Sequence, residues 1–272
     1  TPSAAEFMAR YVRGDGTPVV LRGAARRHYA AAFDGAWHDE RLAERFGDID
    51  VTIETARKED RTRAHASTRV LLGDFLSRYN ESDEYVVSEL PPRMRAELEL
   101  PPCLHCAAVY EHFYDVLFWL NAGASSSVIH SDGTDNLNCV LSGSKRVLIF
   151  PPAYRDYIEQ RPDAFGFARD ERQGNHYFAV DADRMDLVRF PMWSTVQYAQ
   201  ADVAEGDCIF IPREWYHHVR SGDGRSLAVN LWWWHDAAEL LAADADADAA
   251  PVACQPPHNA SLAALHFAMD DV

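Results

Sequence analysis

Residues 118–152 read FWLNAGASSSVIHSDGTDNLNCVLSGSKRVLIFPP, a succession of apolar runs separated by Gly, Ser and Asp. Short runs rich in β-branched and aromatic residues that end at turn residues predict β-strands. The pattern begins at Asp115 and returns downstream in TVQYAQADV, GDCIFIP, HHVRS and SLAVNLWWW. Many short strands at close spacing predict a barrel or a sandwich.

The first hundred residues alternate helical and extended patterns. Apolar positions at helical spacing predict helices over residues 3–11, 39–46 and 71–79, with Ser3 as the first cap. Alternation predicts short strands over residues 18–23, 51–55 and 85–90, and a polar stretch predicts a loop over residues 57–68. The predicted fold class is therefore α+β, and mainly β.

The pattern divides the chain into three regions. Residues 1–83 form an N-terminal α+β region that packs on the barrel, and residues 84–235 form the β-rich core. A helix-like and polar stretch at about 154–192 interrupts that core, and insertions of this kind often carry binding surface. Residues 236–272 predict an acidic, Ala/Asp-rich C-terminal helix and tail.

Charge and composition exclude several classes of protein. With 26 Lys plus Arg against 42 Asp plus Glu, the 272 residues carry a net charge of −16, which makes a nucleic-acid partner unlikely. The 47% hydrophobic content suffices for a sizeable core, and no apolar run reaches the ~18 residues of a membrane span. Because residue 1 is Thr rather than Met, a targeting segment can have been removed, so localisation stays open between the cytoplasm or nucleus and the secretory route.

Five cysteines are an odd number in a chain long enough to fold without cross-links, so no disulfide framework is predicted. Cys103 and Cys106 form a lone CxxC, which favours a local loop or a small disulfide over a metal site. Cys139 and Cys208 lie in strand-like runs, where we expect them to pack as small buried hydrophobic residues.

Three residues suggest a metal site. His130 and Asp132 stand two apart at the end of a strand and therefore point to the same face, although an HxD pair alone is more often a surface hydrogen bond. Of the adjacent His217 and His218, which must point to opposite faces, we choose His217 as the third ligand. Two His and one carboxylate are the ligands of non-haem Fe(II) oxygenases, and zinc is the competing metal.

Lys145 favours iron with an acidic cosubstrate. Lysine occurs only at Lys58 and Lys145, while the other 24 basic residues are Arg, so a Lys in an apolar strand suggests a need for a compact ammonium. No Asp or Glu occurs between Cys139 and Arg155 to neutralise it, and a ligand carboxylate would do so. The alternative is a Lys on an outer rim.

Residues 118–152, together with RFPMWSTVQYAQADVAEGDCIFIPREWYHHV (189–219) and LAVNLWWW (227–234), resemble the JmjC-domain hydroxylases. Among these, the sequence looks closest to the small single-domain protein hydroxylases, the group that includes the asparaginyl hydroxylase of hypoxia-inducible factor. The resemblance is clear over about residues 84–235. It implies a double-stranded β-helix, also called a jelly-roll or cupin barrel, with flanking N-terminal and C-terminal helices.

The resemblance also assigns roles to residues. It implies that His130, Asp132 and His217 bind Fe(II), since Pro212 and Trp215 match the family's IPxxWxH motif. Lys145, fifteen residues after His130 as in the family, would bind the distal carboxylate of 2-oxoglutarate. Four further residues match cosubstrate positions, namely Tyr85, Ser127, Asn136 and Asn230. Loop, cap and backbone-satisfying roles are the alternatives for Ser127, Asn136 and Asn230.

The implied activity is oxidation of a substrate C–H bond by O₂, with conversion of 2-oxoglutarate to succinate and CO₂. A protein or peptide side chain is the expected substrate, and the negative charge suits a basic one. Three alternatives stay open: a tRNA hydroxylase, an N-methyl-lysine or -arginine demethylase, and an inactive cupin-like binding module. The Ala-rich stretch after Trp234 leaves monomer and homodimer undecided.

Overall fold

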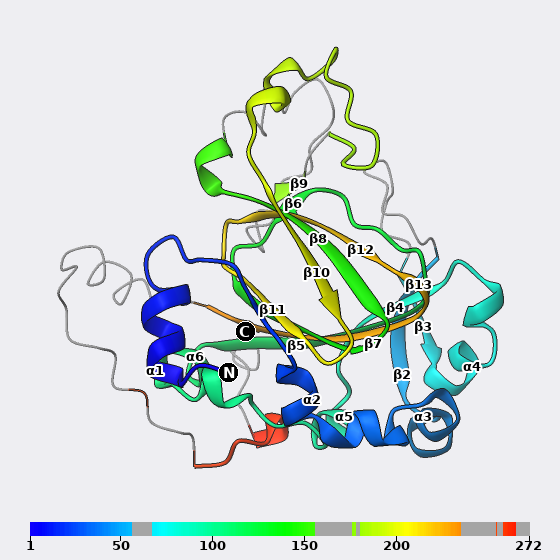
Figure 1. Cartoon of the computed structure of the whole chain (residues 1–272). Coiled ribbons are helices and arrows are strands. Elements are labelled where there is room, and N and C mark those ends of the chain that lie inside the picture. The colour runs from blue at the N-terminus through cyan, green and yellow to red at the C-terminus, as the bar shows by residue number, and fades with distance from the viewer. Residues whose placement is uncertain (56–66, 156–175, 178–179, 235–253, 255–257, 265–272) are drawn as a thin grey trace.

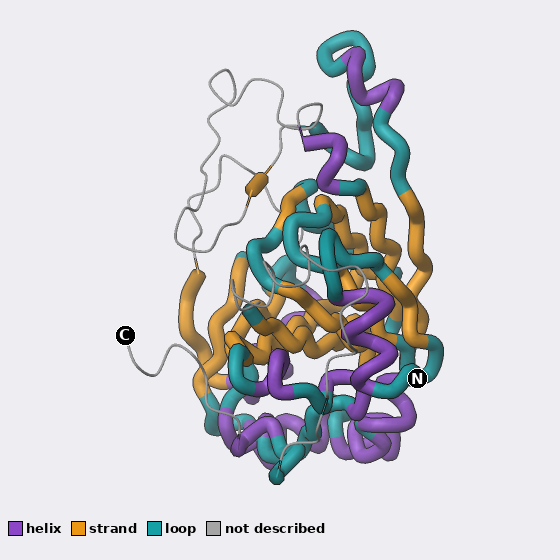
Figure 2. Tube along the Cα trace, turned by 90° about the vertical axis from the view of Figure 1, so that its left-hand side faces the viewer, coloured by secondary structure: helices purple, strands orange, loops and turns teal. Residues whose placement is uncertain are grey.

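A computed structural model of the chain describes residues 1–55, 67–155, 176–177, 180–234, 254 and 258–264. In these residues two antiparallel sheets form a jelly-roll barrel, as predicted (Figure 1). The larger sheet has the strand order β1-β11-β7-β13-β5-β4-β2-β3 and the smaller one β10-β8-β12-β6-β9. The helices gather on the outer side of the larger sheet, and residues 180–198 project from the opposite end (Figures 1 and 2).

The strands agree with the alternating runs of the sequence. The larger sheet contains β1 (Val19–Leu21), β2 (Asp50–Glu54), β3 (Ser67–Leu71), β4 (Tyr85–Glu89), β5 (Phe113–Gly123), β7 (Asp135–Ser142), β11 (Cys208–Ile211) and β13 (Asp223–Trp233). The smaller sheet contains β6 (His130–Ser131), β8 (Ser144–Phe150), β9 (His176–Tyr177), β10 (Ala199–Ala204) and β12 (Tyr216–Ser221). The part of the polar 57–68 segment that is described, Ser67 and Thr68, belongs to a strand rather than a loop.

The helices are short. They are α1 (Ala4–Phe7), which a π-helical turn extends to Val12, α2 (Ala24–His28), α3 (Asp39–Phe46), α4 (Leu72–Leu76), α5 (Pro92–Arg95) and α6 (Ala107–Tyr110). Ser3 caps α1 as predicted, since its side chain accepts the backbone N–H of Glu6 at 3.2 Å. None of the described helices is long and apolar enough to cross a membrane.

Alternation along β5 divides the interior into two parts. Val116, Phe118 and Leu120 are fully buried and belong to the core between the larger sheet and the helices. Trp119 and Asn121, on the opposite face of the same strand, line a cavity inside the barrel. The helices therefore cover one face of the sheet and leave the other to form a site.

The two sheets also pack directly against each other. Val140 and Ile209 of the larger sheet belong to the same buried apolar cluster as Val147, Ile149 and Val203 of the smaller one. This cluster anchors β8, on which Lys145 lies.

Two cysteine predictions were wrong. Cys139 and Cys208 are buried as expected, but they form a disulfide, because the register of β7 and β11 places them directly opposite each other. Cys106 is bonded to Cys254, 148 residues away, and Cys103 is a buried free thiol. Alternation within one strand cannot reveal which residue of a distant strand lies opposite.

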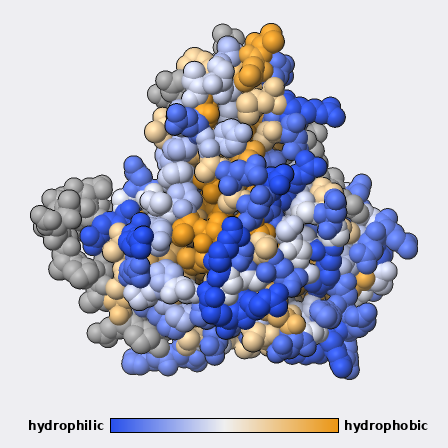
Figure 3. Space-filling view, in the orientation of Figure 1, coloured by the Kyte–Doolittle hydropathy of each residue, from blue (hydrophilic) through white to orange (hydrophobic). Residues whose placement is uncertain are grey.

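Several predictions concern residues that are only partly described. The helix expected after Trp234 lies outside the described residues. Of the C-terminal region, the described residues Leu262–Ala264 form a short 3₁₀ turn. Of the insertion at 154–192, the described residues 180–192 include exposed apolar side chains such as Val188, which is 95% exposed. Apolar surface is visible on the projection at the top of Figure 3. The proposed boundary at residue 83 falls between β3 and β4, which share one sheet with β2.

Candidate active site

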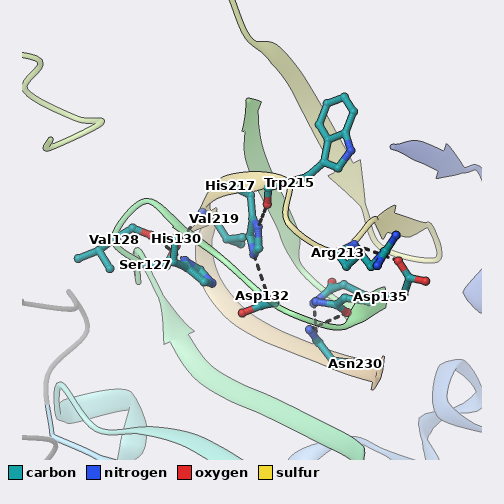
Figure 4. Close-up of polar contacts among 12 residues, drawn as sticks. Ser127, Val128, His130, Asp132, Asp135, Arg213, Trp215, His217, Val219 and Asn230 are labelled. Atoms are coloured by element: carbon teal, nitrogen blue, oxygen red, sulfur yellow. Dashed lines mark hydrogen bonds and ion pairs between the residues drawn. The ribbon is translucent and has the colours of Figure 1, made fainter. Parts of the chain in front are cut away.

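Three side chains meet at one end of the barrel interior. His130 lies on β6 directly opposite His217 on β12, and Asp132 follows β6. The three residues offer ligand atoms that all lie within 4.8 Å of one another, and His217 Nε2 is 3.6 Å from Asp132 Oδ2. Figure 4 shows the three side chains pointing toward one another. Two His and one carboxylate, the set predicted from the sequence, are therefore close enough to share one ion.

Backbone carbonyls orient both imidazoles. His130 Nδ1 lies 2.9 Å from the carbonyl oxygen of Val128, and His217 Nδ1 lies 3.0 Å from that of Trp215 (Figure 4). A neutral ring that donates through Nδ1 carries its lone pair on Nε2. Hydrogen bonds of this kind from the second nitrogen are typical of metal-binding His. The donor set thus fits a divalent metal.

Burial keeps His217 in the form that a metal needs. His217 is 2% exposed, and burial, with His130 as the second cause, lowers its pKa to about 4. The ring is therefore neutral at physiological pH. His218 is also buried, but it is not among the described residues that line the cavity, which agrees with the choice of His217.

Lys145 lies in the same cavity as the triad. It is 7% exposed, and burial lowers its pKa to about 8. Within the described part of the chain, its ammonium has no hydrogen-bond or ion-pair partner. The rim position that was the alternative for Lys145 is therefore excluded, and the cavity offers an anion one buried cation.

Tyr85 and Ser127 both line the cavity, but each makes a contact within the protein. The Tyr85 hydroxyl donates to Glu54 Oε2 at 2.5 Å. Ser127 Oγ accepts the backbone N–H of Val219 at 2.9 Å, which leaves the single proton of that hydroxyl available to donate.

Asn136 and Asn230 are joined with Asn138 in a row on the cavity wall. Asn138 Nδ2 donates to Asn230 Oδ1 at 2.5 Å, and Asn230 Nδ2 donates to Asn136 Oδ1 at 3.1 Å. All three side chains are buried and line the cavity. These contacts join Asn230 to two side chains, whereas the alternative role considered for it was to satisfy backbone groups.

Several lining residues were missed in the sequence. They are polar or aromatic side chains on the inner faces of the strands, namely Trp119, Asn121, Asn138, Ser221 and Trp232, together with Ser125 in the loop that follows β5. The sequence feature that could have identified most of them is a polar residue at every second position of an apolar strand, as at Asn136 and Asn138. This feature can be used only once it is known which face of the strand points into the barrel.

A jelly-roll barrel that holds two His, a carboxylate and a buried Lys around one cavity defines a class of metal-dependent cupin-like proteins. The chain belongs to the cupin-like domain family, whose model matches residues 4–239. The resemblance to JmjC proteins is thereby confirmed.

Curated relatives extend this result. The chain is 31% identical to human bifunctional peptidase and (3S)-lysyl hydroxylase JMJD7 over 43% of this chain and 41% of that protein. It is 28% identical to lysine-specific demethylase JMJ31 of Arabidopsis thaliana over 61% of this chain and 28% of that protein. It is 27% identical to human tRNA wybutosine-synthesizing protein 5 over 46% of this chain and 36% of that protein. The matches cover less than half of each relative, and the three names describe different activities.

Proposed function

We propose that this protein is an Fe(II)- and 2-oxoglutarate-dependent oxygenase that hydroxylates a C–H bond of a protein or peptide side chain. The observation that carries the proposal is that one cavity encloses the His130, Asp132 and His217 triad together with Lys145, whose ammonium has no hydrogen-bond or ion-pair partner among the described residues. A metal ion that also binds a small dianion would satisfy both groups. Family membership supports the same reaction class.

Different residues of the cavity would bind the metal and the cosubstrate. His130, Asp132 and His217 would hold the iron, and Lys145 would bind the distal carboxylate of 2-oxoglutarate by charge and hydrogen bond. Ser127, Asn136, Asn230 and Tyr85 would orient the cosubstrate. When bound, iron would supply the chemistry by which O₂ converts 2-oxoglutarate to succinate and CO₂ and substrate C–H to C–OH. The barrel walls would exclude water from that reaction.

A basic polypeptide is the substrate class that we propose. The net charge of −16 favours a cationic partner and disfavours a polyanion such as tRNA. Among the relatives, a lysyl hydroxylase and a lysine-specific demethylase are named for lysine. Demethylation would start from the same metal site with an N-methyl group as target, so product analysis on peptides must separate the two.

Substitution of Lys145 tests the proposed function without a known substrate. We expect Lys145→Met to weaken 2-oxoglutarate binding by roughly 10- to 100-fold or more, because it removes a charged hydrogen bond of about 1.5–3 kcal/mol. Binding is measured by calorimetry on Mn(II)-loaded protein, and succinate formation by the Fe(II) form is measured in parallel.

The control is Mn(II) affinity, which should be the same in Lys145→Met and wild type because Lys145 does not belong to the triad. Equal 2-oxoglutarate affinity in the two proteins would contradict the assignment of Lys145. Wild-type protein that binds no 2-oxoglutarate and forms no succinate would favour the inactive binding module.

The affinity for 2-oxoglutarate should depend on pH through Lys145. Its pKa of about 8 in the unliganded cavity lies below the usual value, so the charged form that binds an anion is lost as pH rises through 8. We therefore expect affinity to be constant below about pH 7 and to fall above about pH 8. Near pH 8 about half a proton should be taken up on binding.

Calorimetry in buffers of different ionisation enthalpy measures this proton uptake. Lys145→Arg is the matched control, because its guanidinium stays charged throughout and should remove the pH dependence even if it binds more weakly. A wild-type affinity that is constant between pH 7 and 9.5 would contradict the prediction.

A further inference from the structure

A chain of hydrogen bonds runs along the cavity wall and ends at Ser221. Asn121 Nδ2 donates to Ser125 Oγ at 3.1 Å, and Ser125 Oγ lies 3.0 Å from Ser221 Oγ. Ser226 Oγ lies 3.3 Å from Ser221 Oγ on its other side. Asn121, Ser221 and Ser226 are at most 4% exposed, so bulk water does not compete for these bonds.

The direction of this chain is fixed at Asn121. Its Oδ1 accepts the backbone N–H of Gly123 at 2.8 Å, so its amide nitrogen must be the group that faces Ser125. A hydroxyl has one proton and two acceptor positions. Ser125, which accepts from Asn121, has one proton and one further acceptor position with which to bond Ser221.

One hydroxyl proton is left over in this hydrogen-bond chain. Ser125, Ser221 and Ser226 carry three hydroxyl protons, and the two contacts between them use only two of these protons. Ser221 lines the cavity, whereas Ser226 is not among the described lining residues. Ser226 satisfies its own proton by donating to Ser221, so the proton left over belongs to Ser221 or to Ser125, both of which line the cavity. Among the residues that the structure describes, these hydroxyls make no further hydrogen bond that would satisfy it. A buried donor without an acceptor is costly, which indicates that the cavity's ligand supplies the acceptor.

Ser221 lies beside Lys145 and away from the triad. The register of β12 and β8 places Ser221 directly opposite Lys145, and His217 opposite Ile149. His217, Val219 and Ser221 share the inner face of β12, so about 13 Å of strand, four residues at ~3.3 Å each, separates the metal ligand from Ser221. One end of the cavity therefore holds the triad, and the other holds the ammonium of Lys145 and the hydroxyl of Ser221.

We infer that Ser221 is a specificity-determining residue, whose hydroxyl donates to the same distal carboxylate of 2-oxoglutarate that Lys145 binds. This inference rests on the proposed function. The Tyr85 hydroxyl, expected from the family resemblance to contribute at this end, donates to Glu54 and must turn away from it to reach the cosubstrate. Ser221 supplies a second donor without any change of side-chain position, because it can carry the spare proton of the three hydroxyls.

Ser221→Ala tests the inference by ligand binding rather than turnover. Calorimetric titration of 2-oxoglutarate into Mn(II)-loaded protein should show affinity about tenfold weaker than wild type, because a hydrogen bond to a charged group is lost. Ser221→Cys keeps the size of the side chain but donates weakly, and it should lose most of the same affinity. Ser226→Ala is the matched control, since it removes an equally buried hydroxyl from outside the cavity, and its affinity should stay within about threefold of wild type.

The outcomes separate this inference from the function on which it rests. If Lys145→Met weakens binding while Ser221→Ala and Ser221→Cys bind like wild type, Ser221 has no such role although the proposed function stands. If Ser226→Ala loses as much as Ser221→Ala, the effect is one of packing and the inference is overturned. If wild type binds no 2-oxoglutarate at all, the proposed function itself fails. Thermal unfolding and Mn(II) affinity, measured for every variant, should match wild type.

Discussion

Replacing His217 with Ala is expected to lower the affinity for a divalent metal by more than ~100-fold and to abolish succinate formation. Loss of a residue that merely supports a metal ligand typically costs 10- to 100-fold, and loss of a ligand should cost more. His217 is buried, neutral and 3.6 Å from Asp132, so no water-exposed group can easily replace it. Mn(II) binding, followed by calorimetry or electron paramagnetic resonance, measures the effect without turnover.

His218→Ala is the matched control for this experiment. The two His are neighbours on β12 and both are buried, but they point to opposite faces of the strand. We expect His218→Ala to bind Mn(II) within about threefold of wild type, and Asp132→Ala to behave like His217→Ala. Equal losses for His217→Ala and His218→Ala would indicate general destabilisation and would remove the support for the triad.

Removing the Cys139–Cys208 bond should lower the free energy of unfolding by about 4 kcal/mol. The two cysteines are 69 residues apart, and a cross-link of that span lies between the ~3 kcal/mol of a short loop and the ~4.7 kcal/mol of a 100-residue loop. The bond also joins β7, which carries Asn136 and Asn138, to β11. Denaturant unfolding of Cys139→Ala/Cys208→Ala against wild type measures the difference.

Cys103→Ala is the control, because it removes a buried thiol that forms no disulfide. We expect it to cost no more than ~1–2 kcal/mol, which is the loss of a small apolar group. Thiol titration of the denatured, unreduced protein gives an independent measurement, since two disulfides among five cysteines leave one free thiol per chain. Five reactive thiols, together with an unchanged stability of the double variant, would contradict the cross-link.

Local pattern was sufficient for most of the secondary structure. The helix over Asp39–Phe46 and the strand that begins at Tyr85 have the predicted starts, because the spacing of apolar residues acts within a few residues. The same local reasoning placed His130 and Asp132 on one face and showed that at most one of His217 and His218 could join them. The family motif then supported His217, which is 87 residues after His130 in the chain.

Only the tertiary structure decided which residues of different strands lie opposite each other. The partners Cys139 and Cys208, Tyr85 and Glu54, and Ser221 and Lys145 meet across strands that are far apart in sequence. A strand's period specifies which face a side chain takes, but it does not specify which residue of another strand it meets, because register is set by packing of the whole sheet. For the same reason, the sequence could indicate that Lys145 needs an anion, whereas the spare hydroxyl proton beside it arises only because the closed barrel brings Asn121, Ser125, Ser221 and Ser226 together.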